Sequence, residues 1–483
     1  MSATPENLAE LPFLQRLRHH PRGLWYVFWG ELAERASYYG MRTLLALFLI
    51  ARFQYTDAES GQTANYFTAA CYVLPLLGGY IADRWLGKYR TIVYWSIPYI
   101  IGHIILGESH TPFQLYLALA LLAAGSGAIK PNTSTLMGQI YEAEGKMALL
   151  PEAFSFFYAA INIGAATTSI ALPLVVAHYA GVDIANVSSA DPVKLNEAYR
   201  IALLCPTVLM AVALAIFMAG RKNYPVETID PTPKSPALRA EERQTLVRLS
   251  GVFALIAMFW FVYDQSSSTW VLFGTKLMDP TLAPFGITYT AEQMQGLNPV
   301  LIIIFTPIFN WLWTVVRKAR NGVDLPATQK MMIGFWLVIG CMGVMAYAGY
   351  ATHDGTVKVS IWYDVVATVI ITMAELCVSV IGLEFAFNHA SPETRSTVTA
   401  AFLFTVFLGD TLGGWYIGRF YPSEGKDGLP LPGRMSYGGY FLSQAVIMVV
   451  VAGLFYLVAR RFEREDAARG DARNEEASIT LSV

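Results

Sequence analysis

Long apolar stretches separated by short polar segments run along most of the 483 residues. A helix that crosses ~30 Å of hydrocarbon at ~1.5 Å per residue needs about 20 mostly apolar residues. Twelve segments meet this requirement, and we expect each to be a membrane-spanning helix. Their approximate limits are 24–52, 61–82, 91–107, 112–130, 151–179, 199–219, 250–275, 293–316, 331–350, 361–387, 396–420 and 437–459.

The composition supports this interpretation and excludes several function classes. Hydrophobic residues make up 54% of the chain, charged residues 14%, and the mean hydropathy is +0.42. A soluble protein carries roughly 25% charged residues. The net charge of −2 offers no basic surface for nucleic acid. The four cysteines lie in apolar runs without CxxC spacing, which predicts neither a disulfide framework nor a metal site. We therefore expect an all-α membrane protein that needs no cofactor.

The distribution of Lys and Arg predicts the orientation. These residues are concentrated in alternate connections, among them Arg84, Lys88, Arg221 and Arg317. Cytoplasmic loops carry such an excess, and an even number of spans then places both termini in the cytoplasm. Residues 1–21 show no pattern of a cleaved signal peptide. We expect a multi-pass protein of the plasma membrane, or of the inner membrane in a Gram-negative cell.

The longest cytoplasmic connection, 220–249, contains four prolines and divides the spans six and six. A Pro-rich linker is extended and packs poorly, and two six-helix bundles joined in this way match the major facilitator fold. The expected organisation is therefore a cytoplasmic segment (1–23), a first six-helix bundle (24–219), a linker (220–249), a second six-helix bundle (250–459) and a charged cytoplasmic tail (460–483) that we expect to be disordered.

The first span carries an unusual polar stripe. An ionisable residue inside a span is costly unless it faces the bundle interior and finds partners. The stripe has the spacing i, i+3, i+4, i+7, i+8 and i+11, which places its members on one helix face. They are Glu31, Glu34, Arg35, Tyr38, Tyr39 and Arg42. This face should meet a water-accessible cavity or a partner helix. The alternative is a purely structural cluster built on the pair of Glu31 and Arg35.

Three further charged residues stand apart from the stripe. Lys130 ends the fourth span, while Asp264 and Glu375 lie within the seventh and tenth spans. The cations Arg35, Arg42 and Lys130 are thus all in the first half. Counted with Glu31 and Glu34, four carboxylates face three cations. An unpaired buried carboxylate takes up a proton, which is the requirement for a proton-coupled carrier. Asp410 is a fifth acid whose place the pattern leaves open.

Several segments resemble motifs of the proton-coupled oligopeptide transporters, the POT family. Residues 31–40, ELAERASYYG, are similar to the ExxERFxYYG motif, with Ala36 where Phe is usual. Residues 157–164, FYAAINIG, resemble FYxxINxG, and residues 375–384 resemble the tenth-helix motif, with Val380 where Pro is common. Residues 78–88, GGYIADRWLGK, resemble the general facilitator loop, which contains Asp83.

The resemblance implies a role for each matching residue. Glu31, Glu34, Arg35 and Lys130 would couple protons. Arg42 and Lys130 would hold a peptide carboxylate, and Glu375 would hold its ammonium. The gates would be Arg42 with Asp264 outside and Lys130 with Glu375 inside, and Asp83 would belong to the gating residues. The pocket would be lined by Tyr38, Tyr39, Tyr72, Asn162, Trp260, Asn298 and Ser379.

The implied partners are di- and tripeptides, protons and membrane lipids, and the expected state is a monomer that binds no nucleic acid. The linker is too short for the two extra helices of most bacterial members, and Asn65 occupies the position of a second-helix histidine of mammalian members. The seven histidines fall in no motif, and we expect them at interfaces or in loops. The alternatives are a same-fold carrier of nitrate or an amino-acid conjugate, a non-transporting receptor and, with least support, an enzyme.

Overall fold

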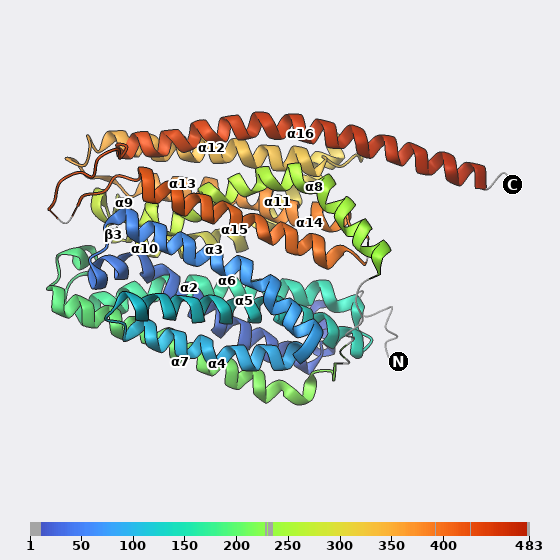
Figure 1. Ribbon diagram of the computed structural model, residues 1–483, viewed down its shortest axis with the longest axis horizontal. Coiled ribbons are helices and arrows are strands. Elements are labelled where there is room, and N and C mark those ends of the chain that lie inside the picture. Colours follow the sequence, from blue (N-terminus) through green and yellow to red (C-terminus); the bar gives the residue numbers. More distant parts are fainter. Residues whose placement is uncertain (1–10, 228, 230–234, 392, 426, 481–483) are drawn as a thin grey trace.

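The computed structural model describes residues 11–227, 229, 235–391, 393–425 and 427–480, with backbone alone for 467–480. Residues 1–10, part of the expected linker and the last three residues of the expected tail lie outside this range. The described chain is almost entirely helical, which confirms the all-α prediction (Figure 1). The helices lie side by side as one elongated bundle.

The helices between residues 13 and 223, the first half of the chain, follow each other with short connections. They are α1 (Phe13–His19), α2 (Arg22–Phe53), α3 (Asp57–Ile81), η2 (Ala82–Leu86), α4 (Lys88–Gly107), α5 (Pro112–Ala143), η3 (Met147–Leu149), α6 (Leu150–Ala180), η4 (Ile184–Ser189), α7 (Pro192–Ala219) and η5 (Gly220–Asn223). The turn η2 is π-helical and continues α3.

The second half contains more interruptions within its spans. Its helices are α8 (Pro236–Tyr263), η6 (Asp264–Ser267), α9 (Thr269–Leu277), α10 (Ala291–Met294), α11 (Leu297–Ala319), α12 (Ala327–Ala351), α13 (Trp362–Glu375), the π-helical η7 (Leu376–Val380), α14 (Ile381–Asn388), α15 (Arg395–Phe420) and α16 (Tyr437–Thr480).

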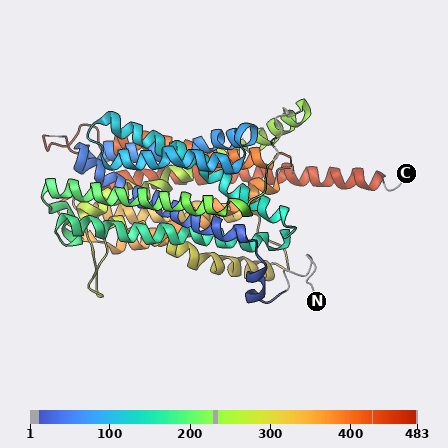
Figure 2. The same ribbon diagram turned by 90° about the horizontal axis from the view of Figure 1, so that it is seen from below.

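The two ends of the bundle differ in the elements that they hold. Short strands lie at the strand end, where β1 (Met278–Asp279) pairs in parallel with β4 (Val359–Ser360), and β2 (Thr281–Leu282) pairs antiparallel with β3 (Ile287–Thr288). The opposite, terminal end holds α1, the start of α8 and the extension of α16 (Figures 1 and 2).

Nine helical segments of the described residues are long and apolar enough to cross a membrane. The helices α2, α3 and α4 are not among them, although the sequence predicts twelve spans. They have 32, 25 and 20 residues, so length is not the reason. Polar side chains lower the hydropathy of these three helices. In α2, for example, four charged residues lie within the span: Glu31, Glu34, Arg35 and Arg42.

The fourth predicted span is longer than expected. It was predicted to end at Lys130, but α5 continues past Pro131 to Ala143, so Lys130 lies in mid-helix. Polar side chains after the proline bond back to the preceding turn: the Asn132 amide donates to the Ala128 carbonyl at 2.6 Å, and the Thr133 hydroxyl donates to the Ile129 carbonyl at 3.0 Å. This back-bonding satisfies polar groups without ending the helix.

Two segments predicted to lack regular structure are helical instead. Within the expected linker, α8 begins at Pro236 because the Ser235 hydroxyl caps the Leu238 amide at 3.2 Å. The expected disordered tail continues α16 to Thr480. There Arg461 and Glu465 form an i, i+4 ion pair at 2.8 Å, and Phe462 is buried.

Buried apolar side chains form two large clusters. One contains residues from Leu24 to Tyr224, and the other contains residues from Leu249 to Phe462 together with Ala46 of α2. The two clusters meet through α3 against α15 and α6 against α11. We refer to the parts of the chain around these clusters as the first and second halves.

Close helix packing generates the first prediction. A Cβ atom added at Gly78 of α3 would lie 2.5 Å from the Ala128 Cα of α5, whereas one added at Gly79 meets nothing within 4 Å. Gly78→Ala should therefore lower stability by about 1–3 kcal/mol through overpacking. Thermal unfolding in detergent measures the effect, with Gly79→Ala as the matched control. Equal melting temperatures for the two variants would contradict the close approach.

Candidate functional site

A cavity of about 210 Å³ lies between the two halves, near the middle of the bundle. Its walls come from α2, α3 and α6 on one side and from α8, η6, α11 and α13 on the other. Eight residues predicted for the site line it: Tyr39, Arg42, Tyr72, Asn162, Trp260, Asn298, Glu375 and Ser379. Asp264, predicted for the outer gate, also lines it. We call this space the central cavity.

Arg42 and Asp264 form an ion pair across the central cavity. Arg42 extends from α2, and Asp264 stands where α8 gives way to η6, so the pair joins the two halves. Asp410 of α15 is fully buried and interacts with both Asp264 and Arg42. Among the described residues Arg42 pairs with Asp264, while neither carboxyl oxygen of the nearby Asp410 has a hydrogen-bond partner. Such a cluster is stable only if one carboxyl carries a proton or gains another donor.

Further polar contacts join the halves on the strand side of this pair. Asp57 of α3 forms an ion pair with Lys276 of α9. The Ser268 hydroxyl donates to the Asn65 side-chain oxygen at 2.7 Å. The amide groups of Gln293 and Gln295 donate to backbone carbonyls of α6 and α2 at 3.1 and 3.2 Å. These contacts close the strand end.

Glu375 ends α13 on the opposite wall of the central cavity. It accepts hydrogen bonds from the Tyr263 hydroxyl at 2.6 Å and the Asn298 amide at 2.9 Å. The Asn298 amide also donates to the Thr372 hydroxyl at 3.0 Å. Within the described residues, Glu375 makes no ion pair, and Lys130 in particular is not its partner. Two neutral donors therefore hold this carboxylate in place.

Lys130 lies against an aromatic ring. Its ammonium stands 4.0 Å from the centroid of Tyr72, a favourable cation–π distance. Tyr72 lines the central cavity and also a larger one of about 1080 Å³ toward the terminal end. Both halves line this larger space, which includes Asp83, the ion-pair partner of Lys88. Tyr72 thus forms part of the wall of both cavities.

The polar stripe of α2 divides into two parts. Glu31, Glu34 and Arg35 are each no more than 3% exposed and lie inside the first half. The Arg35 guanidinium donates to Glu34 at 2.6 Å and lies 3.3 Å from Glu31. Only Tyr39 and Arg42 reach the central cavity, whereas Tyr38 stacks on Phe67 behind its wall. The expectation of one polar face meeting one space is therefore corrected.

The reason for this division is close packing around the first turns of α2. A Cβ atom at Gly164 of α6 would lie 2.5 Å from the Leu32 carbonyl, so α6 packs against the Leu32 side of α2, outside the polar stripe. Glu31 and Glu34 instead border a small internal space between α2, α4, α5 and α7. The acidic pair is separated from the central cavity but remains within electrostatic reach of Lys130.

Several cavity residues were not predicted. Asp364 of α13 is buried and lines the central cavity with Thr368, Ile371 and Glu375. Their spacing of i, i+4, i+7 and i+11 follows one helix face, so the sequence pattern could have identified Asp364. Tyr263 precedes Asp264 directly and was missed because aromatic residues are common in spans.

The expectation for the histidines is wrong at His103. This residue is fully buried in α4, where its Nε2 atom lies 2.9 Å from the Ser37 hydroxyl of α2. His103 is buried because α4 packs against other helices of the first half. The general preference of histidines for interfaces and loops does not reveal this packing. The contact places an imidazole beside the helix that carries the acidic pair.

Comparisons with known proteins agree with the motifs. A family model described as "POT family" matches residues 89–239 and 226–426. The human solute carrier family 15 member 1 is 30% identical, covering 66% of this chain and 50% of the relative. Peptide transporter family 1 of Drosophila melanogaster is 29% identical, and the match covers 68% of this chain and 47% of the relative. The chain thus spans about half the length of the curated relatives it matches.

Solved structures show the same fold. The POT family transporter PepTSo gives a TM-score of 0.75 at 25% identity and covers 92% of this chain and 99% of its own. A POT family transporter in complex with 5-aminolevulinic acid gives a TM-score of 0.77 at 19% identity, and the match covers 95% of this chain and 100% of that structure. At that identity the second match shows the fold alone.

The pair of Arg42 and Asp264 generates the second prediction. Asp264→Asn removes one partner of a buried pair, a loss that typically costs about 3–5 kcal/mol. Because that pair joins the halves, the strand end should open more often. The distance is measured between spin labels at Val193 and Val357, which are exposed and lie on opposite halves, in a background without the four native cysteines. Asp264→Asn should give longer distances between these labels than the parent does.

The matched control for that measurement is Glu108→Gln. Glu108 pairs with Arg200 at 2.8 Å within the first half, so its loss should leave the distances between the halves unchanged. A distance distribution for Asp264→Asn identical to that of the parent would show that the pair does not hold this end closed.

Proposed function

The chain belongs to the POT family, and from this membership we propose that it imports di- and tripeptides together with protons. One observation carries the proposal. The central cavity presents Arg42, with Lys130 nearby, from the first half and Glu375 from the second. Cations and a carboxylate on opposite walls complement the carboxylate and the ammonium that every short peptide carries at its two ends.

The cavity walls suit variable peptide side chains. Tyr39, Tyr72 and Trp260 combine apolar rings with polar tips, which allows contact with many kinds of group. The same walls argue against nitrate, since Glu375 would repel an anion and nitrate has no ammonium to pair with it. The arrangement therefore favours a zwitterionic substrate over the anionic alternative.

The proposed mechanism is alternating access by the two halves. We assign the terminal end to the cytoplasm and the strand end to the outside, with α2, α3 and α4 completing twelve spans. The structure then corresponds to an inward-open state, in which Arg42 and Asp264 are paired and Lys130 lies against Tyr72. In the inward-closed state Lys130 would meet Glu375, and Asp83 would take part on the cytoplasmic side.

Proton coupling is assigned to the acidic pair of α2. Glu31 and Glu34 share the single guanidinium of Arg35, so one carboxylate is in excess inside the first half. Lys130 is close enough to respond to the charge of this cluster. When a proton neutralises the excess carboxylate, Lys130 loses an electrostatic partner and becomes free for a peptide carboxylate or for Glu375.

The third prediction tests recognition of the peptide ends. Purified protein in liposomes with an inward proton gradient should accumulate radiolabelled Ala-Ala. Unlabelled di- and tripeptides should compete, whereas nitrate should not. N-acetylated Ala-Ala lacks the ammonium and C-terminally amidated Ala-Ala lacks the carboxylate, so each should compete at least about tenfold less well.

Two variants assign these ends to residues. Glu375→Gln should bind Ala-Ala more weakly and should no longer discriminate against the acetylated peptide. Arg42→Lys should weaken binding of the free acid, because an ammonium cannot reproduce a bidentate guanidinium contact. If Glu375→Gln still rejects the acetylated peptide as strongly as the parent does, the ammonium is bound elsewhere.

The fourth prediction concerns the coupling cluster. Glu34→Gln should abolish concentrative uptake driven by the proton gradient, because the excess negative charge is lost, while peptide exchange across the membrane persists. Counterflow of labelled Ala-Ala measures the exchange, and Glu108→Gln is the control for a carboxylate outside the cluster. Full gradient-driven uptake by Glu34→Gln would refute the assignment.

A further inference from the structure

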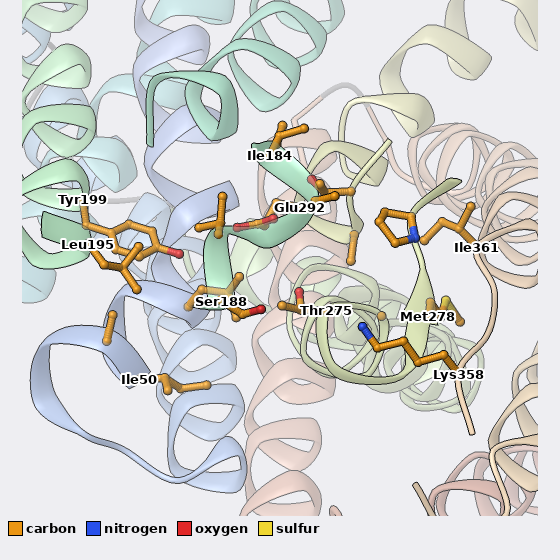
Figure 3. A pocket seen from close by; sticks show the side chains of 18 residues that line it. Ile50, Ile184, Ser188, Leu195, Tyr199, Thr275, Met278, Glu292, Lys358 and Ile361 are labelled. Carbon is orange, nitrogen blue, oxygen red and sulfur yellow. The ribbon is translucent and has the colours of Figure 1, made fainter. Parts of the chain in front are cut away.

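A second cavity, of about 170 Å³, lies between the halves at the strand end and is separate from the central cavity. The first half contributes α2, η4 and α7 to its walls, and the second half contributes α9, β1, α10 and residues near β4. Its lining is largely apolar and includes Ile50, Ile184, Leu195 and Ile361 (Figure 3). We call this space the outer cavity.

The outer cavity contains a buried carboxylate. Glu292 of α10 is only 5% exposed, and Figure 3 shows its side chain within the cavity. Among the residues that the structure describes, Glu292 forms no ion pair, and its side chain interacts with the neutral polar groups of Thr290 and Tyr199. A carboxylate in an apolar space needs either a proton or a counter-charge. A ligand that brings an ammonium group would supply one.

A cation lines the same space. Lys358 is exposed, forms no ion pair in the described part of the chain, and extends its ammonium into the cavity in Figure 3. Thr275 lies between them in that view, and its hydroxyl is buried without a hydrogen-bond partner among the described residues. The cavity therefore offers an acceptor, a donor and an intervening hydroxyl.

The size of the outer cavity limits what it can hold. Its volume of about 170 Å³ is close to that of an engineered cavity of about 150 Å³ that holds benzene. An apolar side chain of that size, together with an ammonium toward Glu292 and a carboxylate toward Lys358, describes a free apolar amino acid. A short peptide has the same end groups but a larger volume.

We propose that the outer cavity is a regulatory site for a free apolar amino acid, with its ammonium at Glu292 and its carboxylate at Lys358. Because both halves form the walls, the occupant stabilises the arrangement in which the strand end is closed. It therefore slows peptide uptake without competing for the central cavity. This consequence for transport rests on the proposed function, whereas binding of the amino acid does not.

Binding of radiolabelled L-phenylalanine to the purified full chain in lipid nanodiscs tests the proposal. Saturable binding is expected for the parent and at least about tenfold weaker binding for Glu292→Gln, with a several-fold loss for Lys358→Gln. Phenethylamine lacks the carboxylate and 3-phenylpropionate lacks the ammonium, so each should displace the label less well than L-phenylalanine does.

Two controls separate this site from others. Glu197→Gln changes an exposed carboxylate of α7 that pairs with Arg200 outside the cavity, and it should bind L-phenylalanine like the parent. Glu375→Gln alters the central cavity and should also retain L-phenylalanine binding. Unchanged Ala-Ala binding by Glu292→Gln shows that this variant is folded.

Several outcomes would overturn the proposal. They are the absence of saturable binding to the parent, loss of binding in Glu375→Gln but not in Glu292→Gln, and displacement by Phe-Ala more effective than by L-phenylalanine. The last result would identify a short peptide as the occupant.

In uptake assays, L-phenylalanine should lower the maximal rate for Ala-Ala without raising its KM, and Glu292→Gln should be insensitive. Failure of Ala-Ala uptake with L-phenylalanine binding intact would reject only the proposed function.

Discussion

A charged side chain inside an apolar helical bundle is stable only where it meets an opposite charge, strong hydrogen-bond partners or a proton. This constraint organises the middle of the molecule. Arg35 pairs with Glu31 and Glu34 on the same helix, whereas Arg42 pairs with Asp264 of another element, close to the buried Asp410. Only the second set therefore couples the position of one helix to the charge state of another.

The location of each pair decides whether it resists or permits motion. Arg35 and its two carboxylates lie on a single helix inside the first half, so they are unaffected when the halves move as rigid units. Arg42 with Asp264 and Asp57 with Lys276 cross between the halves. They must separate if the strand end opens. The protein can therefore change shape while the Arg35 cluster stays paired. Only the charges of the pairs that cross between the halves then need new partners.

The sequence predicts the presence of these charges better than their partners. Spacing along the first span places Glu31 to Arg42 on one face, and the family resemblance names nine of the 22 residues that line the central cavity. Spacing does not show that α4, α5 and α7 surround Glu31 and Glu34 at one end of that face. The pair of Asp57 and Lys276 is separated by 219 positions, and only the packing of α3 near α9 brings them together.

Helix boundaries show the same limit in another form. Lys130 was expected at the end of a span because a lysine, a proline and four polar residues follow each other there. Side chains that bond back to the preceding turn make the same residues compatible with a continuous helix. The tail after residue 460 was expected to be disordered from its charge, yet Phe462 is buried and Arg248 reaches Asp466. Local composition cannot reveal such distant partners.

The surroundings of Glu375 follow from the same constraint and connect it with function. Tyr263 and Asn298 donate hydrogen bonds to this carboxylate, which stabilises it without fixing it to one cation. Replacing neutral donors by an ammonium requires less rearrangement than breaking an existing ion pair, because no second buried charge is left behind. A carboxylate held in this way can accept either a ligand ammonium or Lys130. In the proposed mechanism this choice differs between the two arrangements of the halves, and such a difference in contacts is what allows a ligand to shift a conformational equilibrium.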